Sequence, residues 1–69
     1  MNKFELQRNI EYLVIKYIID EFKKIELISI IKQDSDSAKF ILAELSIHKK
    51  SEYEKSDIEI MKDIAYYYI

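Results

Sequence analysis

The sequence predicts an all-α fold, a small bundle of two or three helices. The 69 residues include no Gly and no Pro, and tight hairpins and turn-rich β folds depend on Gly in particular. Two polar stretches, residues 33–37 and 49–57, divide the chain into three apolar segments. In the first and last of these segments, large apolar side chains recur at the spacing of a helix. We therefore expect helices at residues 3–32, 36–48 and 56–69.

The first expected helix is strongly amphipathic over residues 4–23. At about 100° per residue, its apolar side chains fall on one arc and its charged side chains fall opposite. The apolar arc consists of Leu6, Ile10, Leu13, Val14, Tyr17 and Ile18. The apolar pattern continues to about residue 32, so we predict one helix over 3–32, with a bend or break near Lys23 and Lys24 as the alternative.

The middle segment supports two interpretations. Residues 34–37 are all good N-cap types, and the segment that follows is rich in Ala, Leu, Lys and Glu, which favour a helix over 36–48. However, Ile41, Ala43, Leu45 and Ile47 alternate with more polar residues, which is typical of a strand. The alternative fold is therefore α+β, with a β-hairpin pairing residues 25–32 with 39–48 between two helices.

The last expected helix has a clear start signal. Ser56 is followed three residues later by Glu59, the spacing of a capping box in which Ser56 is the N-cap. The preceding residues offer a second possible box at Ser51 and Glu54. Ile60, Met61, Ile64, Tyr67 and Tyr68 would line one face of this helix.

The chain forms one small domain, residues 1–69. A chain of this size buries only about 60% of the surface that its unfolded form exposes. It has no Cys to form a disulfide, but 49% of its residues are hydrophobic. Stability must therefore come from apolar packing, either within the chain or shared with a partner.

No residue pattern indicates catalysis, a cofactor or a metal. The single histidine, His48, has Glu44 as its nearest acidic neighbour at helical spacing, and we interpret it as an ordinary surface residue. The carboxylates of residues 52–63 lack the Gly and the ligand spacing of a calcium loop, and interspersed lysines make them a solvated face of mixed charge. We read the serines as caps. We expect no enzymatic activity.

The charge pattern disfavours nucleic-acid binding while leaving it open. The net charge is −2. In a helix-turn-helix arrangement, the last helix would present Asp57, Glu59 and Asp63 against Lys62 alone, and phosphates would repel it. A dimer could still assemble a basic surface that a single chain lacks, so a nucleic-acid-binding regulator is the second interpretation.

The C-terminus is the most unusual part of the sequence. Tyr66, Tyr67 and Tyr68 are consecutive, and on a helix they point in directions about 100° apart. One small core cannot bury all three rings, and Tyr is enriched at interfaces. In the first helix, several apolar side chains also lie outside the main arc. The predicted partner-binding residues are Ile15, Ile19, Phe22, Tyr66, Tyr67, Tyr68 and Ile69.

We therefore expect a small protein-interaction module, either an adaptor or inhibitor of another protein or a homodimeric structural protein. The most apolar stretch, residues 12–19, is interrupted by Lys16 and is too short to span a membrane. Glu5 and Arg8 occupy the place of the apolar core of a secretory signal, so we expect a cytoplasmic location. The excess of Ile and Lys indicates an AT-rich genome, which is associated with phages and mobile elements.

Overall fold

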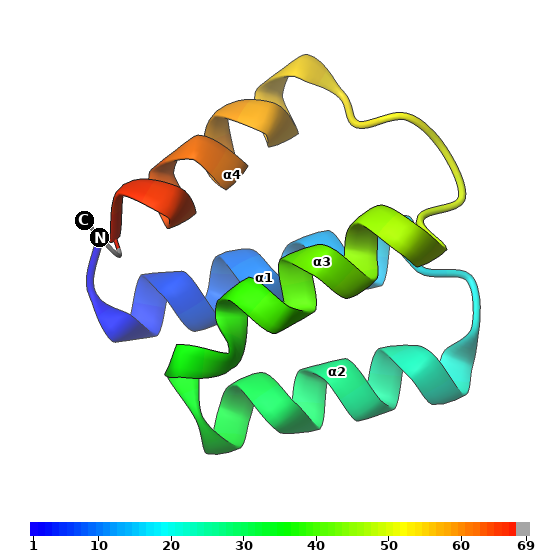
Figure 1. The fold of residues 1–69 in the computed structure, drawn as a ribbon, viewed down its shortest axis with the longest axis horizontal. Coiled ribbons are helices and arrows are strands. Elements are labelled where there is room, and N and C mark those ends of the chain that lie inside the picture. The colour runs from blue at the N-terminus through cyan, green and yellow to red at the C-terminus, as the bar shows by residue number, and fades with distance from the viewer. Residues whose placement is uncertain (68–69) are drawn as a thin grey trace.

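The computed structural model describes residues 1–67, and these residues form an all-α bundle (Figure 1). The α-helices are α1 (Lys3–Tyr17), α2 (Glu21–Gln33), α3 (Ala38–His48) and α4 (Lys55–Tyr67), with a short 3-10 turn, η1 (Ser35–Ser37), before α3. Among the described residues there is no strand, so the all-α prediction is confirmed. The alternative hairpin is wrong, because residues 25–32 lie in α2 and residues 39–48 lie in α3.

The predicted single helix over 3–32 is wrong, because the chain turns back at residues 18–20. Ile18 and Asp20 have extended backbones, and the Asp20 side chain accepts hydrogen bonds from the N–H groups of Phe22 and Lys23. Asp20 is thus the N-cap of a new helix. The break comes before Lys23, and it gives the bundle four helices where we expected two or three.

The last helix begins one residue earlier than predicted. α4 starts at Lys55, so Ser56 lies inside its first turn rather than at the N-cap, and its side chain is exposed. The proposed role of Ser56 as the cap is therefore wrong. The side chain of Asp57, the third residue of the helix, is turned into the protein.

The C-terminal ends of α1, α2 and α3 explain how the chain folds without glycine. The C-caps of α1, α2 and α3 are Ile18, Asp34 and Lys49, all with extended backbone. At each end, the cap N–H still donates to the carbonyl four residues earlier. No residue in the described range has a positive φ, the conformation for which helix ends most often need Gly.

The core lies around α1. α2 and α3 pack against α1 and against each other, whereas α4, alone among the described helices, packs against α1 only (Figure 1). The fully buried apolar side chains are Leu6, Ile10, Leu13, Val14, Tyr17, Ile18, Leu27, Ile31, Ala38, Ile41, Leu45 and Ile64. In α3, the buried residues 38, 41 and 45 follow helical spacing, so the alternation that favoured a strand had no bearing on burial.

Candidate interaction surface and a buried carboxylate

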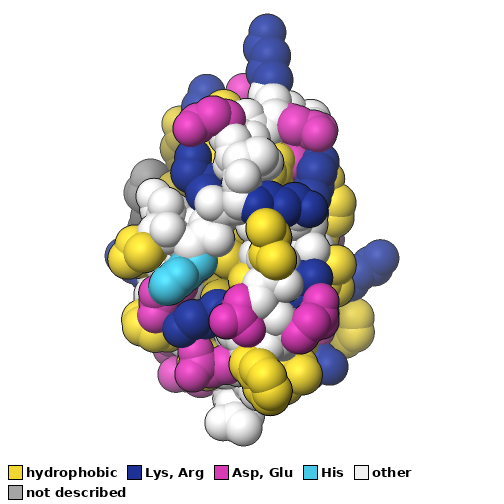
Figure 2. Space-filling model, turned by 90° about the vertical axis from the view of Figure 1, so that its right-hand side faces the viewer, with side chains coloured by type: hydrophobic (Ala, Val, Ile, Leu, Met, Phe, Trp, Pro, Cys, Tyr) yellow, Lys and Arg dark blue, Asp and Glu magenta, His cyan; other side chains and the backbone are white. Residues whose placement is uncertain are grey.

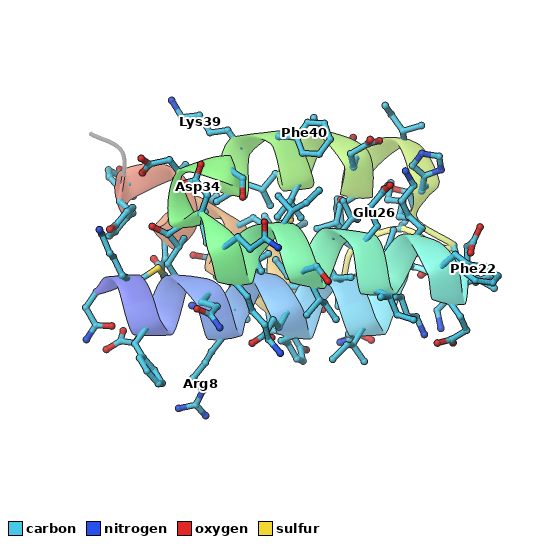
Figure 3. All side chains as sticks on the ribbon, turned by 90° about the horizontal axis from the view of Figure 1, so that it is seen from below. Arg8, Phe22, Glu26, Asp34, Lys39 and Phe40 are labelled. Atoms are coloured by element: carbon cyan, nitrogen blue, oxygen red, sulfur yellow. The ribbon has the colours of Figure 1, made fainter. Side chains whose placement is uncertain are left out.

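Three of the predicted partner-binding residues lie exposed around the α1–α2 connection. The side chains of Ile15, Ile19 and Phe22 are 57%, 68% and 87% exposed. Ile15 is in the last turn of α1, Ile19 is in the connection, and Phe22 is in the first turn of α2. Figure 3 shows Phe22 at this end of the bundle, pointing away from the other helices.

The same end of the molecule carries Ile47, which is 73% exposed. The backbone joins the two regions, because Ile18 pairs with Lys49 in an isolated antiparallel bridge and the Lys50 N–H donates to the Tyr17 carbonyl at 2.9 Å. Ile19 and Ile47 therefore flank paired segments. We call Ile19, Phe22 and Ile47 the end surface. Ile47 was not among the predicted partner-binding residues, although the helix predicted over 36–48 places it off the face that carries Ile41 and Leu45.

Charged pairs surround these apolar side chains. Glu44 lies 3.8 Å from the Lys23 ammonium and 3.4 Å from His48 Nε2, so it ties α3 to the start of α2. Lys23 also pairs with Glu26, mainly by a hydrogen bond, and this pair raises the pKa of Lys23. Figure 2 views this end directly and shows hydrophobic side chains interspersed with both signs of charge and the histidine.

The last turn of α4, with Tyr66 and Tyr67, lies at the opposite end of the bundle (Figure 1). Tyr66 is exposed, and Tyr67 is half-buried against the core. Both line an open groove with Met1, Glu5 and Asp63. α1, which is about 22 Å long at 1.5 Å per residue, separates this groove from the end surface. The structure thus does not bring the two predicted groups into one patch. Tyr68 and Ile69 lie outside the described residues.

A second feature is the carboxylate of Asp57, the one charged side chain among residues 1–67 that is fully buried. The Tyr12 hydroxyl donates to Asp57 Oδ1 at 2.8 Å, and the Tyr17 hydroxyl donates to Oδ2. The Lys16 ammonium lies 2.8 Å from Oδ2. All three groups come from α1, so one carboxylate of α4 is held by three side chains of one neighbouring helix.

Further contacts extend this network into the α3–α4 connection. Lys16 also pairs with Glu54 at 2.9 Å, and the Glu54 N–H donates to the Tyr17 hydroxyl at 2.9 Å. The Tyr17 ring packs edge-on against Tyr53, with ring centroids 4.9 Å apart. The Tyr53 hydroxyl is buried and has no hydrogen-bond partner among the described residues.

The network shifts the ionisation of its members. Burial acts to raise the pKa of Asp57, but hydrogen bonds from Lys16, Tyr17 and Tyr12 oppose it and hold that pKa below its ordinary value of 3.8. The hydrogen bond to Asp57, together with those to Tyr12 and Glu54, raises the pKa of Lys16. Burial, and then the bond to Asp57, raise the pKa of Tyr17. At neutral pH, Asp57 is therefore a carboxylate and Lys16 is an ammonium ion.

The sequence analysis did not single out Asp57 as a buried group. We assigned it with its acidic neighbours to a solvated face, because Lys55 and Lys62 lie close to it in sequence. One signal was available: Tyr12, Lys16 and Tyr17 bring three donor groups into one six-residue stretch of the helix, and Tyr17 lies on its apolar arc, where its hydroxyl is buried. Such a group of donors requires an acceptor when it is buried.

The described residues contain no group of three or more His, Cys, Asp or Glu side chains that could hold a metal ion. None of the helices within residues 1–67 has the length and apolar character needed to cross a membrane. Comparison of the chain with protein-family models, with curated proteins and with solved structures finds no match.

Proposed function

We propose that this chain is a small non-enzymatic interaction module that binds another protein through its end surface. The observation that carries the proposal is the exposure of Ile19, Phe22 and Ile47 in a chain whose core is filled by other side chains. The three side chains come from neighbouring segments at one end of the bundle, and exposed apolar side chains with polar groups around them are typical of interaction sites.

The surroundings of the end surface fit a protein partner. Protein interfaces have an apolar centre with aromatic residues and a polar rim. Here Phe22 and two isoleucines supply the centre, and Lys23, Glu44 and His48 supply polar groups beside it. The proposal keeps the cytoplasmic location that the sequence predicts, and a second copy of the chain is the other candidate partner.

The distribution of charge supports a protein partner over nucleic acid. Among the described residues, at least six of the eleven Lys and Arg side chains form ion pairs with carboxylates; they are Lys16, Lys23, Lys24, Lys32, Lys49 and Lys62. A surface that binds phosphates needs lysines and arginines free of such pairs. Lys23 and Lys49, which lie at the end of the molecule that carries the end surface, both pair with carboxylates.

A comparison of two matched variants tests the proposal. Phe22→Ser removes the most exposed side chain of the end surface, and Phe4→Ser removes a phenylalanine that is 75% exposed near the start of α1. Tagged wild-type protein and both variants are used to capture partners from lysate of the source cell, and captured proteins are quantified. We expect Phe22→Ser to lower the yield of one stoichiometric partner at least about tenfold, as loss of an interface hot spot does, and Phe4→Ser to leave it unchanged.

Sedimentation of the purified chain at micromolar and near-millimolar concentration identifies self-association. A dimer that Phe22→Ser dissociates would make a second copy the partner. A monomer at both concentrations, with no captured protein that depends on Phe22, would contradict the proposal. Salt-sensitive binding to DNA or RNA in a mobility assay would replace it with the nucleic-acid interpretation.

A further inference from the structure

α4 is attached to the rest of the molecule differently from the other helices. Among the described elements, it packs against α1 alone, whereas each of α1, α2 and α3 packs against the other two. Of the twelve fully buried apolar side chains, eleven lie between Leu6 and Leu45, and Ile64 is the one that α4 provides. Helices α1–α3 thus contain nearly all of the core.

The remaining attachment of α4 is polar and lies at its first turn. Asp57 is held by Tyr12, Lys16 and Tyr17, and Glu54, directly before the helix, contacts the same Lys16 and Tyr17. Further along, residues of α1 and α4 line open grooves, one formed by Glu5, Arg8, Asn9, Tyr12 and Ile60 and the other by Met1 and Tyr66 among others. Ile64 and the half-buried Ile60, Met61 and Tyr67 hold this part of the helix.

We propose that α4 opens as a unit while α1–α3 stay folded, and that the contacts of Asp57 with α1 set how often it opens. Proteins open locally in cooperative units, and a unit with few buried apolar contacts opens most readily. Removing Asp57 from its three donors forfeits hydrogen bonds to a charged group, the strongest class of such bonds in proteins. Opening uncovers the side of α1 that carries Tyr12, Lys16 and Tyr17, a surface separate from the end surface.

Amide hydrogen exchange in the intact chain, measured by NMR, tests this inference. In the wild type, we expect the amides of residues 60–67 to be less protected than those of Leu13, Leu27 and Leu45 in the core of α1–α3. Asp57→Asn should lower the protection of the α4 amides about 10- to 100-fold, the loss that corresponds to one or more hydrogen bonds to a charged group. Amides of α2 and α3 that exchange only when the whole chain unfolds should lose protection by no more than the same factor, because Asp57 also contributes to global stability, and they should stay better protected than those of α4. Asp63→Asn, an exposed carboxamide substitution on the same helix, is the matched control and should change neither.

A second variant covers the case in which Asp57→Asn unfolds the whole chain. Tyr12→Phe removes one of the three donors from a partly buried position and leaves the carboxylate paired with Lys16 and Tyr17. It should lower α4 protection by a smaller factor and leave the α4 amides less protected than those of α2 and α3. Equal protection of all four helices in the wild type would overturn the inference, and so would unchanged protection of α4 with Asp57→Asn. The result does not depend on the end surface having a partner.

Discussion

At the scale of single residues, two tyrosines in contact show how a buried hydroxyl can either stabilise or destabilise the fold. The Tyr17 hydroxyl donates to Asp57 and accepts from the Glu54 N–H, so its hydrogen-bonding capacity is used. The Tyr53 hydroxyl is also buried but has no partner among the described residues. A buried polar group without a partner loses its hydration and gains nothing in return. The two rings therefore pack against each other, but only the hydroxyl of Tyr17 makes hydrogen bonds that offset the cost of its burial.

Removal of each hydroxyl tests this difference. Tyr53→Phe should raise the free energy of unfolding by up to about 1 kcal/mol, because it removes an unpaired polar atom and keeps the ring against Tyr17 and beneath the Lys49 ammonium. Tyr17→Phe should lower the free energy of unfolding, because Asp57 and the Glu54 N–H each lose a partner. Urea unfolding of both variants measures the sign. Destabilisation by Tyr53→Phe would show that its hydroxyl has a partner such as an ordered water.

At the scale of elements, helix boundaries were the least predictable feature. The amphipathic arc of α1 predicts that positions 20, 21 and 24 should be apolar if the helix continued, yet they are Asp, Glu and Lys. That shift in phase was the available signal for the turn at residues 18–20, and the apolar run of residues 25–31 concealed it. Ser56 shows the opposite case, a good local capping pattern that the burial of Asp57 overrides.

The two capping assignments give a direct test. Asp20→Ala should lower the free energy of unfolding by about 1 kcal/mol, because the N–H groups of Phe22 and Lys23 lose their acceptor. Ser56→Ala should change it by less than about 0.5 kcal/mol, as substitutions of exposed residues away from specific contacts do. Thermal or urea unfolding followed by circular dichroism compares the two. A larger loss for Ser56→Ala than for Asp20→Ala would mean that α4 begins at the capping box after all.

At the scale of the whole molecule, the all-α class followed from composition, but the packing partners did not. The missing Gly and Pro and the apolar arc of α1 identified the fold class and most of the α1 core. The exposure of Ile15, Ile19 and Phe22 followed from their position off that arc, whereas that of Ile47 required the buried face of the helix at residues 38–48, which Ala38, Ile41 and Leu45 define. The contacts of Asp57 with Tyr12 and Tyr17 join residues 40 or more positions apart, and local patterns in a single sequence do not encode such pairings.

The same network makes global stability sensitive to acid. Because the pKa of Asp57 is lower in the folded chain than its ordinary value of 3.8, its ionisation stabilises the fold fully at pH values well above 3.8. That contribution declines as the pH falls below 3.8 and through the folded-state value. Urea midpoints measured between pH 7 and pH 2.5 should therefore fall less steeply on the acid side in Asp57→Asn than in the wild type. Asp63→Asn should retain the wild-type slope, and an equal loss of slope in both variants would contradict this assignment.

The helix ends described above have a consequence for the unfolded chain. Because every described connection uses backbone angles open to any residue with a Cβ atom, no position needs the conformational freedom of Gly. An unfolded chain without Gly samples fewer backbone states, so folding costs less conformational entropy per residue. A 69-residue domain has a small core, and this lower entropic cost compensates for part of the apolar surface that a larger domain would bury. Because the chain contains no Gly, it also offers no position for stabilisation by replacing Gly with Ala, a common route in other proteins.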